Sequence, residues 1–138
     1  MKKIMLLGII LLFSSCSNRI SKEDLKKLNG YWEIDLVRFS DGTTKEYNVN
    51  TSIDYIQLEG LKGFRKKVQP KLNGTFSTSN DAEPFLILKN EDSFEFHYKN
   101  ELSSWKEELI ELSNDDFSVS NEEGIVYSYK RFTPINIK

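Results

Sequence analysis

The stretch LKKLNGYWEIDL, from Leu25 to Leu36, contains the pattern that decides the fold. Leu25 and Leu28 are three residues apart and therefore lie on one face of a short helix. Asn29 and Gly30 follow, and a glycine at this place ends a helix because it adopts the left-handed conformation readily. Beyond the glycine, apolar and acidic side chains alternate, which is typical of a half-buried strand. The stretch predicts a short helix that runs directly into a β-strand.

The residues before this stretch predict where the helix begins. Ser21 can cap the first turn, and Glu23 and Asp24 place negative charge at the positive end of the helix dipole. Ile20 can pack against Leu25 across the cap. We expect a helix of one or two turns that starts after Ser21.

The rest of the chain is a series of short strand-like segments separated by turn residues. Asp41-Gly42 and Asn73-Gly74 are typical of hairpin turns, and Pro70 is expected to interrupt or end a strand. The expected strands are residues 31–39, 53–58, 64–68, 75–78, 84–88, 93–98, 105–112, 117–120 and 125–132. Turn residues recur about every 8 to 12 positions, which predicts an antiparallel barrel or sandwich.

One segment, residues 105–112, fits two kinds of secondary structure. Trp105, Leu109 and Leu112 would share one face of an amphipathic helix. We favour a strand, because the segments on both sides of it are strands.

The two ends of this series resemble the lipocalin-type barrel. Gly30-Tyr31-Trp32 after a short helix is similar to the opening of that family, and YSYKRF at 127–132 is similar to its closing strand. The organisation of residues 25–132 resembles the short lipocalin-like lipoproteins common in Bacteroidetes-type bacteria. The resemblance implies an all-β fold: a small antiparallel up-and-down barrel of about eight strands with a short N-terminal helix. It also implies that Arg131 packs across Trp32, which plugs the closed end of the barrel.

The first sixteen residues are typical of an exported lipoprotein. Lys2 and Lys3 precede an uncharged apolar run, Ile4–Phe13. At 1.5 Å per residue this run reaches only about half of the ~30 Å hydrocarbon core of a bilayer, so we expect a signal peptide and not a transmembrane helix. The following Ser14-Ser15-Cys16 resembles a lipobox, in which the cysteine is acylated and becomes the first mature residue.

These features divide the chain into three parts: a lipoprotein signal peptide at 1–15, a tether at 16–21 and a barrel domain at 22–138. Cys16 is the sole cysteine, so no disulfide can form within the chain. Fatty acyl chains such as palmitate on Cys16 would anchor the protein, since two or more chains bind a bilayer stably. We expect a cell-envelope location, at the outer membrane. The sequence does not distinguish its periplasmic face from its surface face.

The composition gives little support to catalysis, metal binding or nucleic-acid binding. The 138 residues include one histidine and carry a formal net charge of −2. A mildly acidic chain gives no reason to expect nucleic acid, and a single histidine poorly supports a metal site or a Ser-His-Asp triad. We expect no catalytic residue, no metal and no cofactor. His97 is expected to face solvent beside Glu95, and Glu107, Glu108 and Glu111 are expected to form a solvated face.

A local concentration of positive charge occurs at Lys62, Arg65, Lys66, Lys67 and Lys71. We expect an exposed edge strand or hairpin that these charges protect from pairing with another chain. The alternative is contact with anionic lipid headgroups or with a polyanionic glycan.

Aromatic side chains expected to point inward are the candidates for a ligand pocket. They are Tyr55, Phe85, Phe94, Phe96 and Tyr127. The same rings would equally serve as plain core. Two functions follow: a module that binds a small apolar or amphipathic ligand in the barrel mouth, or a packed barrel that presents its surface to an envelope protein partner. A large cavity inside the barrel would favour the binding module, whereas a filled interior would favour the packed barrel with a protein partner.

Overall fold

The computed structural model describes residues 19–78 and 81–134, so the expected signal peptide and Cys16 lie outside the described residues. The first element is a 3₁₀ helix, η1 (Lys22–Leu28), which begins as the sequence predicts. The backbone N–H of Asp24 donates to the Ser21 hydroxyl, and the Asp24 carboxylate accepts from the Ser21 backbone at 3.0 Å. This reciprocal capping fixes the start of the helix.

Ten strands follow the helix. They are β1 (Gly30–Arg38), β2 (Thr44–Glu46), β3 (Ile53–Glu59), β4 (Lys62–Pro70), β5 (Phe76–Thr78), β6 (Glu83–Asn90), β7 (Ser93–Lys99), β8 (Ser104–Leu112), β9 (Asp116–Asn121) and β10 (Val126–Arg131). Residues 105–112 therefore form a strand, as favoured from their neighbours. Strand β2 was not expected from the sequence, and its three residues are all exposed.

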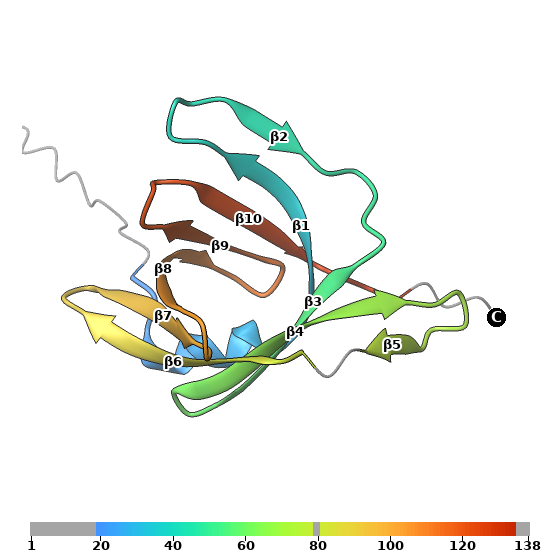
Figure 1. Cartoon of the computed structure of the whole chain (residues 1–138), viewed down its shortest axis with the longest axis horizontal. Coiled ribbons are helices and arrows are strands. Elements are labelled where there is room, and N and C mark those ends of the chain that lie inside the picture. The colour runs from blue at the N-terminus through green and yellow to red at the C-terminus, as the bar shows by residue number, and fades with distance from the viewer. Residues whose placement is uncertain (1–18, 79–80, 135–138) are drawn as a thin grey trace, which may run out of the picture.

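Eight of these strands form a closed antiparallel barrel (Figure 1). Neighbouring strands follow the order β10-β9-β8-β7-β6-β4-β3-β1, and β1 then pairs with β10 to close the ring. The two short strands lie off this ring, β2 beside β1 and β5 beside β4. The expected all-β, up-and-down barrel with a short N-terminal helix is confirmed.

The place of β4 in the ring corrects one expectation about the basic residues. We expected these charges to protect an exposed edge strand or hairpin, but β4 pairs with β3 on one side and, on the other, with β6 over Lys62–Arg65 and with β5 over Val68–Pro70. A strand that is paired on both sides has no edge to protect. The charges on β4 therefore need another explanation.

One end of the barrel is sealed by η1 and Trp32. The Trp32 side chain is fully buried, and its ring nitrogen donates a 2.8 Å hydrogen bond to the carbonyl of Leu28. Arg131 covers the ring, with its guanidinium carbon 3.9 Å from the ring centroid. The same guanidinium donates to the carbonyls of Lys27 and Asn29, each at 2.7 Å. The contact between Trp32 and Arg131 that the resemblance implied is present, and it ties the last strand to the end of the helix.

Gly30 is required at this junction for two reasons. Its φ of +123° lies in the region that L side chains rarely adopt, and a Cβ there would lie 2.6 Å from Nη1 of Arg131. The absence of a side chain lets the chain turn from helix to strand and lets the guanidinium reach the helix carbonyls.

The interior next to the helix is filled by apolar side chains. The buried cluster consists of Leu25, Leu28, Trp32, Ile56, Phe85, Ile87, Phe94, Phe96, Tyr98, Leu109, Phe117, Val119 and Tyr129.

Within residues 19–78 and 81–134, no helix combines the length and the apolar character needed to cross a bilayer.

Candidate ligand-binding cavity

A cavity of about 520 Å³ occupies the barrel end away from η1. Its place follows from strand direction: Trp105 of β8 and its neighbour Tyr98 of β7 line the cavity, whereas Leu109, four residues further along β8, packs in the core. The lining is rich in charge and in aromatic rings. It comprises Asp54, Arg65, Lys66, Lys67, Asp81, Glu83, Glu107, Tyr98, Trp105, Tyr127, Tyr129 and Asn121.

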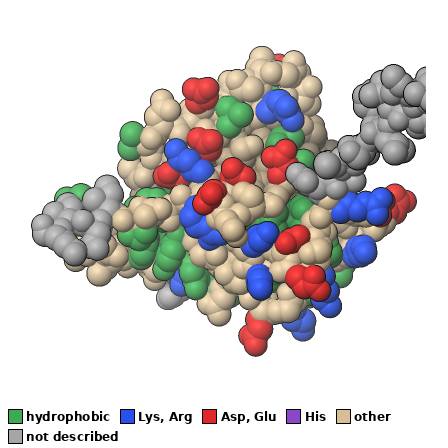
Figure 2. Space-filling view, turned by 180° about the vertical axis from the view of Figure 1, so that it is seen from behind, with side chains coloured by type: hydrophobic (Ala, Val, Ile, Leu, Met, Phe, Trp, Pro, Cys, Tyr) green, Lys and Arg blue, Asp and Glu red, His purple; other side chains and the backbone are tan. Residues whose placement is uncertain are grey.

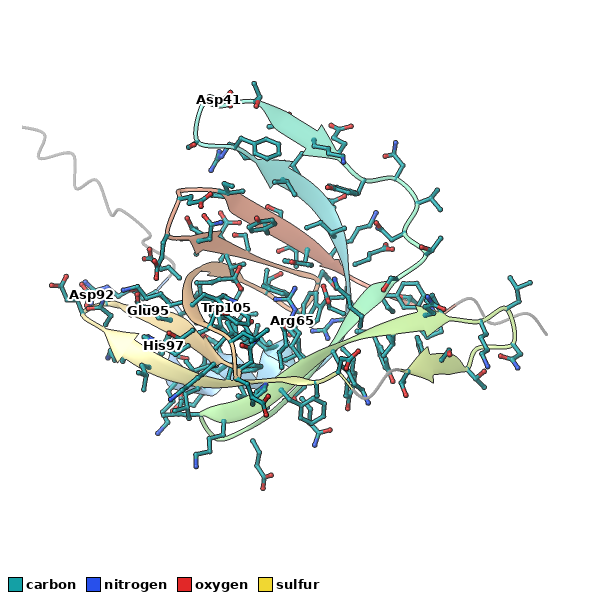
Figure 3. The ribbon with its side chains drawn as sticks, in the orientation of Figure 1. Asp41, Arg65, Asp92, Glu95, His97 and Trp105 are labelled. Atoms are coloured by element: carbon teal, nitrogen blue, oxygen red, sulfur yellow. The ribbon has the colours of Figure 1, made fainter. Side chains whose placement is uncertain are left out.

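Arg65 lies at the centre of this lining, in the space that the strands enclose (Figure 3). Only 12% of its side chain is exposed, and its Nη2 lies 2.9 Å from the carboxylate of Asp54. Its Nη1 lies 3.5 Å from the Tyr98 hydroxyl and 4.0 Å from the Glu107 carboxylate. The guanidinium carbon stands 4.8 Å from the centroid of the Tyr129 ring. One buried cation therefore contacts two carboxylates and two aromatic side chains.

Strand alternation places this cation inside and its neighbour outside. Side chains two apart on β4 share a face, so Arg65 and Lys67 both point inward. Lys67 is the register partner of Asp54 on β3, and its Nζ lies 2.8 Å from that carboxylate. Lys66 also borders the cavity, but its Nζ lies 5.8 Å from the ring of Tyr55, on the outer face. The expectation that all these cations lie at the surface is therefore wrong for Arg65.

The outer surface carries no large area of one charge in the view of Figure 2, where Lys and Arg side chains are interspersed with Asp and Glu. The concentration of positive charge in the sequence is thus divided in space. Part of it enters the barrel and part of it joins a mixed surface.

The two buried carboxyl groups are in unlike electrostatic environments. Burial works to raise the pKa of Asp54, but the charges and hydrogen bonds of Arg65 and Lys67 outweigh it, so the pKa lies below its ordinary value. Burial also raises the pKa of Glu107, and there Arg65 offsets the effect only in part. Asp54 is thus held firmly as an anion, while Glu107 is the less compensated acceptor in the cavity.

The place of Glu107 corrects a second expectation. We expected Glu107, Glu108 and Glu111 to form one solvated face, but the Glu107 side chain is only 13% exposed. Glu108 and Glu111 are exposed. Alternation along β8 turns Glu107 inward with Trp105 and leaves Glu108 outside.

The five expected pocket residues are distributed over three places. Phe85, Phe94 and Phe96 point inward, but they are buried in the packed core. Tyr55 was expected to point inward; instead, its ring packs against Tyr31, with centroids 4.9 Å apart, because alternation on β3 turns Asp54 and Ile56 inward. Tyr127 lines the cavity.

Several cavity residues were not expected from the sequence, because their local patterns indicate an inward side chain only in part. Tyr98 continues the alternation of Phe94 and Phe96, so that pattern alone indicates an inward side chain. Trp105 lies in the segment that also fitted a helix. The neighbouring residues of Arg65 do not indicate that its side chain points inward, because its acidic partner Asp54 is on another strand.

His97 lies on the outer face of β7, as the sequence predicts. Its Nε2 is 3.4 Å from the Glu95 carboxylate, and 36% of its side chain is exposed. In the described part of the chain, His, Asp and Glu side chains form no group of three or more suited to a metal ion.

The closed ring of strands, the helix at one end and the Arg131–Trp32 contact together define a lipocalin-like barrel. No protein-family model and no curated protein matches the chain. Among solved structures, the chain is similar to a lipocalin-like protein from Bacteroides uniformis ATCC 8492, with 12% sequence identity and a TM-score of 0.49. That similarity covers 77% of this chain and 99% of the other.

Proposed function

We propose that this protein is a lipid-anchored envelope protein whose barrel binds a small polar or amphipathic ligand in the cavity around Arg65. The observation that carries the proposal is the cavity itself. Its volume of about 520 Å³ is within the range of small-molecule sites, roughly 300–1,000 Å³. Polar groups that converge on such a space can fix the orientation of a ligand.

The buried charges favour binding over a purely structural role. Desolvating Arg65, Asp54 and Glu107 costs free energy, and apolar side chains of similar volume often stabilise a fold as well or better. A barrel that served only as a scaffold would gain little from these ions. Hydrogen bonds from a ligand would offset part of the cost of burying these ions. The role we propose is binding and not catalysis.

Native mass spectrometry of the full chain carrying Cys16→Ser tests this role. The protein is mixed with a library of sugars, amines, carboxylates and fatty acids, and we expect a one-to-one complex with at least one class. Trp105→Ala, which removes a cavity wall, should weaken that complex, whereas His97→Ala on the outer face should not. Complexes that survive Trp105→Ala unchanged would place binding elsewhere.

The anchor rests on the lipobox-like Ser14-Ser15-Cys16 after an apolar run. In a Gram-negative host supplied with labelled palmitate, the full chain should take up label and partition with membranes. Cys16→Ser should abolish both. Equal labelling of the two forms would refute the anchor and leave the binding role to be judged by mass spectrometry.

A second candidate function is docking to an envelope protein. Large apolar side chains are exposed on the outer face of β6 and β8, where Leu86, Leu88 and Ile110 are each more than 40% accessible. This role predicts that no class in the library binds and that a protein is crosslinked through these positions instead.

A further inference from the structure

We infer that the ligand of this cavity is a neutral polyhydroxylated molecule of the saccharide class. The inference rests on the proposed binding role and specifies its chemistry. Three features of the cavity carry it: internally compensated charges, donors and acceptors side by side, and a flat aromatic wall.

The four charges around the centre of the cavity compensate one another before any ligand enters, whereas the carboxylates of Asp81 and Glu83, which also line it, are exposed. Asp54 is paired with Arg65 at 2.9 Å and with Lys67 at 2.8 Å, and Arg65 also approaches Glu107 at 4.0 Å. An anionic ligand would compete with two carboxylates for Arg65. A cationic ligand would meet Arg65 and Lys67 at short range. A neutral ligand leaves these pairs intact and avoids both costs.

Hydroxyl groups match the hydrogen-bonding capacity that remains. A guanidinium has five N–H donors, and among the described residues those of Arg65 have two hydrogen-bond partners, Asp54 and the Tyr98 hydroxyl. The Glu107 carboxylate can only accept when ionised, and it faces the same space. A hydroxyl both donates and accepts, so neighbouring hydroxyls of one ligand can accept from Arg65 and donate to Glu107. Hydrogen bonds to charged groups are among the stronger ones.

An aromatic wall stands beside these polar groups. The rings of Trp105 and Tyr98 are stacked, with centroids 5.2 Å apart and planes 10° from parallel. Tyr98 is buried and Trp105 is half-buried at the cavity, which leaves part of the indole available. The C–H faces of a sugar ring pack on such a surface while its hydroxyls point sideways to polar groups. A simple alkyl chain would use the wall, but it would offer no hydrogen bond to the remaining N–H donors of Arg65 or to the Glu107 carboxylate.

Calorimetric titration of the full chain carrying Cys16→Ser tests the saccharide class. The probes are neutral oligomers of glucose, galactose, mannose and N-acetylglucosamine, with galacturonate, glucosamine and dodecanoate as charged and apolar comparisons. We expect at least one neutral oligomer to bind, and the charged and apolar probes to bind at least tenfold more weakly.

Variants on one strand provide the matched controls. Trp105→Ala and Glu107→Gln should each weaken binding of the neutral oligomer about tenfold or more. Glu108→Gln lies next in sequence but outside the barrel, and it should change binding less than twofold. Circular dichroism of each variant establishes that the fold is retained.

The outcomes separate this inference from the binding role on which it rests. Binding of galacturonate, glucosamine or dodecanoate that depends on Trp105, without binding of any neutral oligomer, would overturn the saccharide class and retain the cavity as a binding site. Neutral-oligomer binding that is insensitive to Trp105→Ala and Glu107→Gln would overturn the site assignment. Binding of no probe would contradict both.

Discussion

Arg65 is the side chain on which the chemistry of the barrel interior depends. It is held by Asp54 on the adjacent strand, and its face lies over Tyr129 on the other side of the barrel. Two forces oppose each other here: loss of hydration disfavours the cation, whereas nearby carboxylates and the aromatic ring favour it. Because the cation is central to several contacts, its loss leaves more than one group without a partner.

Replacing Arg65 should therefore cost far more stability than replacing its neighbour. We expect Arg65→Met to lower the free energy of unfolding by about 3 kcal/mol, at the low end for breaking a buried ion pair because Lys67 still contacts Asp54. Lys66→Met, on the outer face, should change it by no more than about 0.5 kcal/mol. Urea unfolding followed by circular dichroism measures both. Equal effects of the two substitutions would argue against a buried Arg65.

Glu107 should affect stability in a way that depends on pH. A carboxyl with a raised pKa in the folded protein costs stability above that pKa, and the cost disappears as pH falls through it toward the unfolded value of about 4.3. Glu107→Gln should thus be most favourable relative to the wild type at neutral pH. The difference, measured by urea unfolding at several pH values, should shrink on acidification. A Glu107→Gln advantage that grows as pH falls would have the wrong sign for this account.

At the scale of elements, the junction between η1 and β1 joins three parts of the chain. Arg131 from β10 reaches the last carbonyls of η1, and Gly30 at the start of β1 leaves it the room to do so. The sealed end thus depends on residues that are about a hundred positions apart in sequence.

Gly30→Ala should reveal this dependence in a double-mutant cycle. We expect a loss of about 2 kcal/mol in the wild type, from a strained φ and from contact with Arg131. The loss should be smaller in an Arg131→Ala background, where only the strain of φ remains. Gly42→Ala is the control, since its φ is also positive but no atom lies within 4 Å of the added Cβ. Additive effects of Gly30→Ala and Arg131→Ala would mean that the two sites are independent.

The same scale shows how far the sequence predicts the fold. Turn residues and alternation locate nine of the strands, because a strand with one buried face has a local signature. The exposed residues of β2 (Thr44–Glu46) lack that signature. The ring closure of β1 with β10 follows only from the family resemblance. The charge pattern of β4 was also misinterpreted: its cations are typical of an edge strand, but Arg65 and Lys67 point inward and pair with acidic residues on β3 and β8.

The candidate site was predicted only in part, because its position depends on contacts between distant parts of the chain. Inward aromatic residues are evident from alternation, but alternation does not say at which end of the barrel a side chain lies. Phe94 and Tyr98 share a face of β7, yet only Tyr98 lines the cavity. The packing of η1 against one end decides this, and that is a property of the assembled barrel.

The whole molecule thus has two unlike ends. One is filled with apolar side chains beneath the helix, and the other holds a charged cavity. The chain contains two tryptophans, and each reports on one end: Trp32 is sealed beneath Arg131, and Trp105 lines the cavity. Trp32 is therefore an internal reference for changes that a ligand causes at Trp105.

The most direct test of the binding role is the indole region of a ¹H–¹⁵N NMR spectrum of the full chain carrying Cys16→Ser. The two indole signals are assigned with Trp105→Phe, and the library of sugars, amines, carboxylates and fatty acids is added class by class. We predict that at least one class shifts the Trp105 signal in a saturable manner while the Trp32 signal stays in place. A Trp105 signal that no class moves, or a shift confined to Trp32, would contradict a binding cavity at the barrel end away from η1.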